Sequence, residues 1–432
     1  MQAQSYRSER VYWWDAAPRE AEQPITLPTQ CDCLVVGAGY AGLNAALRLA
    51  EAGRHVVVCE AGPPGYGGSS RSGGMIGHGH RLSYQTLYDR YGRDRAQALV
   101  HEGIHSLTYL KQLIVSRGLD AGLQEVGRLR GAWTQADYEA MGREADLLSR
   151  DFKLPVEVIS KADLHREIAT SCYQGGLLFL SHAGVHPALY QQSLLAAVRQ
   201  AGAQVAGFTP VRGYRREGEG FLVETPRGTV RARTLLLASN GYTAPPFSKQ
   251  ARALVPIPSF LIATAPLGVE QVRALIPNQR MVVETREKHL YYRPSPDGER
   301  IILGGRAALH PIPLDEAQMR LRRELVALFP SLEPVEITHC WTGNVAMTRS
   351  DLPGIGQADG VWFALGCNGS GVALMSYLGH KLAMKVLGEA EGKTAFDDLP
   401  FQAVPFYDGR PWFLPLMTYW FRMRDWWRSS SS

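Results

Sequence analysis

Three glycines near the amino end have the spacing of a backbone that must approach a phosphate. Gly37, Gly39 and Gly42 form a Gly-x-Gly-x-x-Gly pattern. The first glycine permits a tight turn, the second lets the main chain approach a pyrophosphate, and the third lets a helix pack closely on a strand. Free N–H groups at the start of the following helix also favour an anion. The spacing therefore indicates a site for the pyrophosphate of a dinucleotide.

An acidic residue stands in register with this turn. Glu60 lies about 20 residues beyond it, where a carboxylate can accept hydrogen bonds from ribose hydroxyls. Apolar runs at 33–36 and 55–59 predict two strands, and residues 43–52 between them predict a helix. This order favours a dinucleotide site over a glycine-rich turn without a ligand. The predicted ligand contacts here are Gly37, Gly39, Tyr40, Ala41, Gly42, Glu60 and Ala61.

A second glycine-rich loop at 67–75 contains serines and an arginine at its centre. Small residues let the backbone approach a ligand, hydroxyls bind its oxygens, and Arg71 can neutralise a phosphate. The alternative is a flexible linker. The predicted ligand contacts are Gly68, Ser69, Ser70, Arg71, Ser72, Gly73, Gly74 and Met75.

Two further turns follow apolar strands near the middle and the end of the chain. The run 235–239 ends at Asn240, and the run 361–365 leads into a glycine-rich turn before a helix at 372–388. Ligands bind at the carboxyl ends of strands in α/β sheets. Three glycine-rich loops exceed what a nicotinamide cofactor needs, so we predict FAD. The contacts predicted from these regions are Asn240, Gly241, Gly369, Ser370, Gly371, Val372 and Ala373, and Val211 is a further predicted contact.

Composition narrows the class of protein. The chain has 432 residues, 45% of them apolar and 20% charged, as in a folded protein. A net charge of +5 without a basic run gives no argument for nucleic acid. None of the six cysteines forms a Cys-x-x-Cys pair, so we expect reduced thiols and no metal site. With no signal peptide or run of 18 apolar residues, we expect a cytoplasmic protein.

The predicted elements divide the chain into two kinds of structure. Strands alternating with helices predict an α/β, Rossmann-like FAD-binding domain with a parallel sheet and a β-meander. Successive β-prone runs after residue 255 predict a second, mostly antiparallel α+β substrate domain. The predicted boundaries are an N-terminal arm at 1–30, an FAD-binding domain at 31–90, 155–254 and 346–400, a substrate domain at 91–154 and 255–345, and an aromatic C-terminal tail at 401–432.

The ordered set of motifs resembles the D-amino-acid-oxidase-like flavoprotein superfamily, and within it the gamma-glutamylputrescine oxidase branch. The resemblance covers nearly all of residues 1–425. It rests on Tyr12-Trp13, the 37–42 turn, Glu60, the 67–74 loop, Asn240-Gly241-Tyr242, Gly304-Gly305-Arg306, Trp341-Thr342-Gly343, residues 351–356 and residues 366–373.

The resemblance implies an FAD-dependent enzyme that oxidises the C–N bond of an amine or amino acid. A hydride would pass to flavin N5, and water would hydrolyse the imine to a carbonyl. The helix that begins near Gly371 would place its N–H groups at the flavin N1–C2 edge, where they stabilise the charge of the reduced ring. Because adjacent residues of a strand face opposite sides, only one of Tyr291 and Tyr292 can face the flavin. The residues expected to contact substrate or act in catalysis are Tyr291, Arg306, Trp341 and Asn368.

Two departures from the pattern of these relatives concern the electron acceptor and the linkage of the flavin. Some relatives place a lysine near the flavin to activate oxygen, but residues 301–304 contain none, so the electron acceptor can be oxygen, a quinone or another molecule. Cys340 is out of register with a cysteine that tethers flavin in those relatives, so we expect non-covalent FAD. Alternatives are oxidation of a C–O bond, as in a 2-hydroxy acid, or a flavin-binding protein without turnover.

The C-terminal tail is rich in tryptophan and arginine between residues 411 and 428. One interpretation is an interfacial helix that makes peripheral contact with the inner face of a membrane. The other is a helix that packs on its own body or forms a homodimer.

Overall fold

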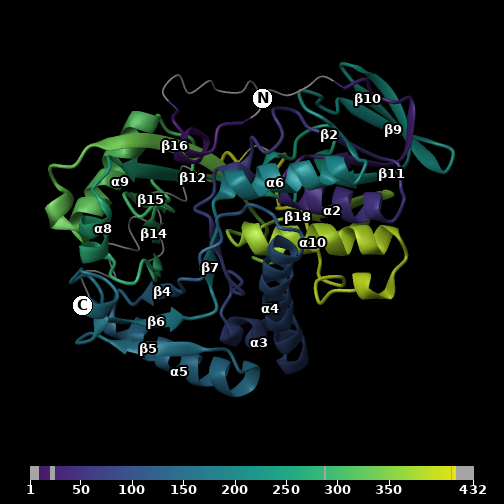
Figure 1. Cartoon of the computed structure of the whole chain (residues 1–432). Helices are drawn as coiled ribbons and strands as arrows, with labels where there is room; N and C mark the ends of the chain where they lie inside the picture. Colours follow the sequence, from purple (N-terminus) through teal and green to yellow (C-terminus); the bar gives the residue numbers. More distant parts are fainter. Residues whose placement is uncertain (1–8, 20–24, 287–288, 410, 415–432) are drawn as a thin grey trace.

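The computed structural model describes residues 9–19, 25–286, 289–409 and 411–414. Within these residues the chain forms two eight-stranded sheets that lie side by side and one short two-stranded ribbon, β3 (Met75–Ile76) with β7 (Ala183–Gly184) (Figure 1). Within the same ranges, no helix combines the length and apolar character needed to cross a bilayer.

The first sheet is the predicted α/β unit. Its strand order is β17-β18-β11-β1-β2-β8, and parallel pairing joins β18 through β8. The central strands are apolar on both faces because helices cover the sheet. β9 and β10 extend β11 as the expected antiparallel meander. The bounds are β1 Gln30–Val36, β2 Val56–Cys59, β8 Gln204–Ala206, β9 Gly213–Glu217, β10 Gly220–Thr225, β11 Gly228–Leu237, β17 Gly354–Ala358 and β18 Val361–Leu365.

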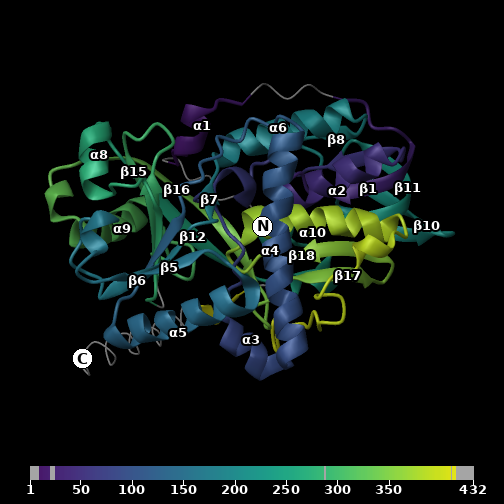
Figure 2. The same cartoon turned by 60° about the horizontal axis from the view of Figure 1, so that its bottom comes forward.

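Helices complete the first unit. Helix α2 lies against α10, and α10 in turn contacts the long helix α4, which crosses it in Figure 2. Shorter helices connect the strands. The bounds are α2 Tyr40–Glu51, α3 Tyr84–Tyr91, α4 Arg93–Ser116, α6 Pro187–Gln200, α7 Ser248–Ala251 and α10 Gly371–Val386, with 3-10 turns η1 Gly68–Ser70, η3 Asn240–Tyr242 and η5 Ala390–Gly392.

The second sheet has the order β16-β12-β15-β14-β13-β4-β6-β5 and is antiparallel except between β13 and β4. Helix α9 packs on it through Leu314, Ala317, Leu321, Leu325 and Leu328, whose three- and four-residue spacing forms one apolar stripe. The bounds are β4 Arg128–Gly131, β5 Val156–Ser160, β6 Gly175–Phe179, β12 Val255–Thr264, β13 Met281–Glu284, β14 Leu290–Pro294, β15 Ile301–Gly305, β16 Ile337–Met347, α5 Gln135–Phe152, α8 Val269–Leu275, α9 Leu314–Leu328, η2 Leu164–Arg166 and η4 Pro330–Leu332.

The fold class is therefore confirmed, but two segments lie elsewhere than expected. Residues 155–254 were grouped with the first unit, yet β5 and β6 pair within the second sheet. Residues 91–154 were grouped with the second unit, yet α4 packs on α10 and shares the first unit's core. A short strand's partner depends on the whole topology, which local sequence patterns do not contain.

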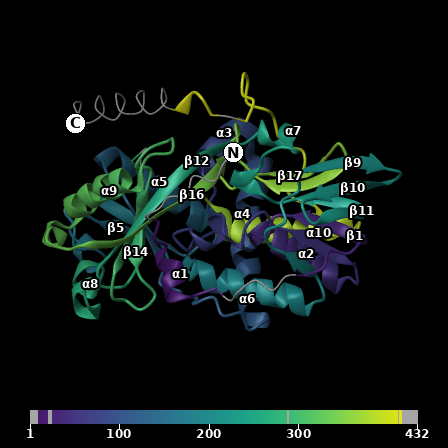
Figure 3. The ribbon, with the colours of Figure 1, turned by 90° about the horizontal axis from the view of Figure 1, so that it is seen from above.

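The N-terminal arm lies across the junction of the two units. Its helix α1 (Tyr12–Ala16) contacts α6, as Figure 3 shows from above. Trp13 is completely buried in a cluster with Leu261, Ile302 and Trp341. The predicted helix of the tail falls largely at 415–432, outside the described residues.

A prediction follows from the contact between α2 and α10. A methyl group added at Gly379 would lie 2.1 Å from the carbonyl oxygen of Ala41. We expect Gly379→Ala to lower the free energy of unfolding by about 1–3 kcal/mol, because the two helices must separate. The matched control is Gly142→Ala in α5, where a methyl group meets nothing within 4 Å. This control should be neutral or stabilising by about 1 kcal/mol. Equal urea midpoints for both variants would refute the contact.

Candidate functional site

The turn between β1 and α2 has the close geometry that its glycines predict. Gly37 has a φ of 107°, and a methyl group at Gly42 would lie 1.9 Å from the Gly37 carbonyl oxygen. Gly39 is the N-cap of α2 and provides no side-chain cap. The Tyr40 N–H donates to Ser69 Oγ at 3.1 Å, which brings the second loop to this helix N-terminus.

Glu60 reaches back from the end of β2 to the same turn. Its Oε2 accepts from the Ala38 N–H at 2.8 Å, and its Oε1 accepts from the Gly62 N–H at 3.2 Å. Burial raises the pKa of this carboxyl, and the hydrogen bonds from backbone N–H groups oppose the rise. The Thr209 N–H donates to the Glu60 carbonyl at 2.7 Å, which places half-buried Val211 near this end of the sheet. Ala61, beside Glu60, is exposed.

The serine-rich loop is held by the N-terminal arm. Ser70 Oγ donates to the Gly65 carbonyl at 2.6 Å and accepts from Trp14 Nε1 at 2.8 Å and Arg19 at 2.9 Å. Trp13 Nε1 donates to the Ser72 carbonyl at 2.9 Å. These indole donors reach across more than fifty residues of sequence to fix a loop of small residues.

Arg71 links the serine-rich loop to the N-terminal arm. Its Nη1 forms an ion pair with Glu9 and donates to the Thr342 carbonyl at 3.0 Å. The guanidinium carbon lies 4.5 Å from the Trp14 ring centroid and 4.2 Å from the Tyr66 ring centroid. With its charge paired and its plane between two rings, Arg71 fastens the arm to the loop. Its Nη2 is buried without a partner among the described residues, so its contact with a phosphate stays a prediction.

The side chains of the two predicted asparagines also form hydrogen bonds with backbone groups. Asn240 Oδ1 accepts from the Gly366 N–H at 2.9 Å. Asn368 Oδ1 accepts from the Thr348 N–H at 2.9 Å, and its Nδ2 donates to the Gly366 carbonyl at 2.8 Å. Both ends of the Asn368 amide are therefore used inside the protein. The catalytic role expected for Asn368 does not agree with this geometry, which assigns it to shaping the 366–371 turn.

Helix α10 begins beside open space. Gly369 has a φ of 95°, and a methyl group there would meet no atom within 4 Å. Ser370 is the N-cap but provides no side-chain hydrogen bond, and Gly371, Val372 and Ala373 form the first turn. Val372 and Ala373 are buried, whereas Gly369 is exposed and Ser370 and Gly371 are partly exposed. An uncapped, positively polarised helix N-terminus next to open space suits an acceptor-rich ligand.

Tyr291 brings the second sheet to the same region. A methyl group at Gly73 would lie 2.9 Å from the Tyr291 ring, and one at Gly304 would lie 2.2 Å from its Cζ. The ring therefore lies over Gly304 and faces the loop. The Tyr291 hydroxyl is 2.9 Å from Ser259 Oγ. Burial raises the pKa of this phenol to about 12, against smaller opposing effects of Ser259 and Arg306.

The neighbours of Tyr291 have structural partners. Tyr292 faces the opposite side, where its hydroxyl lies 2.9 Å from that of Tyr173. Trp341 is fully buried and donates from Nε1 to the Arg71 carbonyl at 2.8 Å, so it supports the loop and cannot contact substrate as expected. Arg293 is also buried and donates to the Gly74 and Val185 carbonyls. Arg306 follows β15 and retains partial exposure.

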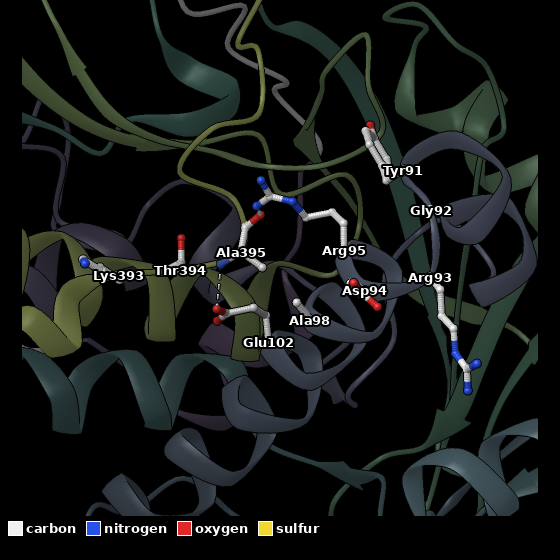
Figure 4. A pocket seen from close by; sticks show the side chains of 10 residues that line it. All are labelled: Tyr91, Gly92, Arg93, Asp94, Arg95, Ala98, Glu102, Lys393, Thr394 and Ala395. Atoms are coloured by element: carbon white, nitrogen blue, oxygen red, sulfur yellow. Dashed lines mark hydrogen bonds between the residues drawn. The ribbon is translucent and has the colours of Figure 1, made fainter.

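A surface groove of about 680 Å³ lies elsewhere, between the start of α4 and residues 393–395 (Figure 4). Its lining includes no residue of the predicted site. Glu102 accepts from the Ala395 N–H across it at 2.8 Å, and Arg95 donates to the Ala395 carbonyl. These contacts join the segment after α10 to α4, so we assign the groove no part in catalysis.

Comparison with known proteins decides the family. The DAO family, described as FAD dependent oxidoreductase, matches residues 32–384. The chain belongs to this family. Its members' cofactor agrees with the FAD predicted from the three loops.

Similar proteins extend the comparison. The chain is 29% identical over 382 residues to gamma-glutamylputrescine oxidoreductase of Escherichia coli, covering 88% of each chain. It is 24% identical over 385 residues to glycine oxidase of Geobacillus kaustophilus, covering 86% of this chain and 96% of that one. The crystal structure of the latter enzyme superposes with a TM-score of 0.73 at 23% identity, covering 88% and 99% of the chains. L-proline dehydrogenase from P. horikoshii superposes with a TM-score of 0.69 at 20% identity, covering 89% and 98%.

The residues at the site suit FAD. The α2 turn with Glu60 would hold the adenosine and pyrophosphate end, where its glycines let the main chain approach the ligand. The Gly73–Gly74 segment and the α10 N-terminus would hold the flavin end. Gly369 is exposed, and a methyl group added there would meet no atom of the described chain within 4 Å, so the approach to the α10 N-terminus is open to a ligand.

Sequence reasoning missed the residues that support the loop. Glu9, Trp14 and Arg19 touch Ser70 or Arg71, although the sequence separates them by about fifty residues or more. Nothing local in the Tyr12-Trp13-Trp14 run indicated its partner. A buried tryptophan needs an acceptor for its N–H. This requirement was the one signal in the sequence that the arm binds another segment.

The arm yields a prediction about cofactor retention. Trp13→Phe keeps the ring but leaves the buried Ser72 carbonyl without its donor. We expect FAD to bind roughly 5- to 30-fold more weakly, because an unpaired buried carbonyl loosens the loop. Titration of the apoprotein with FAD measures this. Trp362→Phe, at a half-buried residue of β18, should leave the affinity unchanged. A Trp13→Phe affinity equal to the control's would contradict a role for the arm.

Proposed function

We propose that this protein oxidises the C–N bond of an amine or amino acid with FAD, and that water then hydrolyses the imine to a carbonyl and an amine. The observation that carries the proposal is the meeting of three elements. The Tyr291 ring faces Gly73, the loop continues into β3, and α10 contacts β3. These contacts support a flavin loop that lies between Tyr291 and α10.

The named relatives support a nitrogen-containing substrate. Gamma-glutamylputrescine oxidoreductase and glycine oxidase are both named for amines or amino acids. Oxidation of a C–O bond is the alternative, and the substrate panel below distinguishes the two.

The chain's own residues position the substrate and exclude water from it. FAD, when bound, supplies the hydride acceptor. Such a transfer needs the substrate carbon held close and the nitrogen deprotonated, and it needs no strong base. Tyr291 forms one wall, and its protonated phenol can donate a hydrogen bond. Arg306, at the end of β15, is the residue we propose for a carboxylate next to the reacting nitrogen.

We propose that the flavin is not covalently bound. Cys340 Sγ donates to the Leu314 carbonyl at 3.4 Å within the core beneath α9. Burial raises the pKa of this thiol to about 12, so it is not a nucleophilic thiolate. Acid precipitation should therefore release the flavin into the supernatant; flavin that stays with the pellet contradicts this.

We also propose that the tail from residue 411 contacts a membrane or a second copy of the chain. Phe406 and Trp412, just before and within it, are exposed. Flotation of the protein with anionic vesicles, done with the full chain and with a chain that lacks residues 411–432, distinguishes membrane contact from contact with a second copy.

The substrate class can be tested by anaerobic reduction of the flavin. We expect primary or secondary amines or amino acids to bleach its visible band, whereas 2-hydroxy acids do not. Simple imine hydrolysis should then yield one carbonyl for each flavin reduced. Bleaching by hydroxy acids alone would overturn the proposal.

The high pKa of Tyr291 predicts a pH profile. Its phenol stays protonated below about 12, so the substrate ammonium is the group that titrates. We expect kcat/KM to rise about tenfold for each pH unit below the amine's pKa, without a falling limb up to pH 10. Tyr291→Phe should keep this shape. A falling limb that disappears in Tyr291→Phe would show that the phenol titrates in catalysis.

A further inference from the structure

Three hydrogen-bond donors without acceptors gather around the serine-rich loop and the N-terminal arm that binds it. They are Arg71 Nη2, Arg19 Nε and Gln191 Nε2, each buried without a partner among the described residues. Arg71 is 4% exposed and Gln191 is 1% exposed, so solvent has little access to either side chain. Because a buried donor without an acceptor is costly, this group of donors indicates an acceptor-rich ligand.

The three donors come from different elements but meet at one stretch of the loop. Arg19 Nη2 donates to Ser70 Oγ at 2.9 Å, and Arg71 is the next residue of the loop. A methyl group at Gly65 would lie 2.5 Å from Gln191 Nε2, and the Gly65 carbonyl accepts from Ser70 Oγ at 2.6 Å. The arm, the loop and α6 therefore each contribute one donor beside Ser70 or Gly65.

Positive charge exceeds negative charge at this place. The guanidinium carbons of Arg19 and Arg71 lie 4.1 and 4.5 Å from the centroid of the Trp14 ring, so two cations share one aromatic side chain. Glu9 forms an ion pair with Arg71, whereas no carboxylate of the described residues lies at ion-pair distance from half-buried Arg19. Burial, and secondly the charge of Arg71, lower the pKa of Arg19 to about 10. Two adjacent guanidinium groups with one acid suit an anion that accepts several hydrogen bonds.

The helix N-terminus expected to hold the pyrophosphate is one residue away along the loop. Ser69 Oγ accepts from the Tyr40 N–H at 3.1 Å, and Ser70 beside it accepts from Arg19. Consecutive Cα atoms are about 3.8 Å apart, which is less than the length of an arginine side chain. A phosphate held at the start of α2 is therefore within reach of the arm.

The arm precedes residue 32, where the match to the family begins. It is nevertheless attached to both units of the fold. The Arg10 N–H donates to the Cys340 carbonyl in β16 at 3.1 Å, and Gln192 Nε2 in α6 donates to the Ala17 carbonyl at 3.0 Å. The family match itself implies no ligand contact from this segment, but the segment lies where the unpaired donors meet.

We propose that Arg19 of the arm binds the pyrophosphate of FAD together with Arg71, so that the arm closes on the loop when the cofactor binds. The phosphate oxygens supply acceptors for Arg71 Nη2 and Arg19 Nε and offset the second positive charge. Gln191 Nε2 adds a neutral donor beside them. Without the cofactor, repulsion between the two guanidinium groups weakens the attachment of the arm. The inference rests on FAD as the cofactor and does not depend on which substrate is oxidised.

Hydrogen exchange of the arm tests the proposal in the unsubstituted protein. The apoprotein is measured alone and with equal concentrations of FAD, ADP, riboflavin or inorganic phosphate, and exchange is followed at the amides of residues 9–19. ADP has the pyrophosphate without the flavin, whereas riboflavin has the flavin ring without a phosphate. We expect FAD and ADP to slow this exchange roughly tenfold or more, and riboflavin and inorganic phosphate to slow it less than about twofold.

Three results of this experiment would overturn the proposal. The first is an arm whose exchange FAD or ADP leaves unchanged. The second is slowing by riboflavin as strong as that by ADP, which would show that the flavin and not the pyrophosphate closes the arm. The third is equal slowing by inorganic phosphate, which would show a general anion site.

Matched variants separate Arg19 from the rest of the arm. We expect Arg19→Gln to weaken the binding of FAD and of ADP to the apoprotein roughly 5- to 50-fold, and Arg19→Lys to recover part of the loss. Salt should weaken ADP binding less steeply in Arg19→Gln, because one ionic contact is gone. Arg54→Gln, at an exposed arginine between α2 and β2, should bind both ligands as the unsubstituted protein does.

An Arg19→Gln affinity for ADP equal to that of Arg54→Gln would refute the role of Arg19. These binding measurements need no turnover. If no amine or amino acid reduces the bound flavin, the proposed function fails, while the exchange and affinity data still decide on the arm.

Discussion

The flavin loop cannot hold its own shape, and the rest of the site depends on how other elements fix it. Residues 67–74 are glycines, serines and one arginine, so they contribute little apolar burial. Instead, indole N–H groups of Trp13 and Trp341 bind the carbonyls of Ser72 and Arg71. Such donors satisfy buried carbonyls that would otherwise cost about 1–3 kcal/mol each. The loop is thus fixed by the arm on one side and by the second sheet on the other.

This arrangement explains why two units make one site. The first sheet supplies the helix N-termini and Glu60, which suit phosphates and ribose. The second sheet supplies the face on which the Tyr291 ring lies against Gly73 of the loop. Arg293, on the same face, is saturated by carbonyls and fastens the loop to the sheet. In the proposed site, cofactor binding and substrate choice would therefore depend on different elements.

The sequence predicted features whose cause is local. The Gly37–Gly42 turn, the uncapped start of α10 and the alternation of Tyr291 and Tyr292 follow from spacing, propensity and strand period. The roles of Arg71, Trp341 and Asn368 could not be predicted in this way. Each is decided by a partner distant in the chain: Glu9 for Arg71, the Arg71 carbonyl for Trp341, and Thr348 within a tertiary turn for Asn368. The membership of β5 in the second sheet depends likewise on pairing with β6.

The central claim is that the flavin lies between the Gly73–Gly74 segment, the Tyr291 ring and the start of α10. A crystal structure of the FAD-loaded protein tests it most directly. We predict that the isoalloxazine lies against this segment, with one edge at the N–H groups of Gly371 and Val372 and one face toward Tyr291. A ring that lies away from Tyr291, or an α10 N-terminus that contacts no part of the cofactor, would contradict the account.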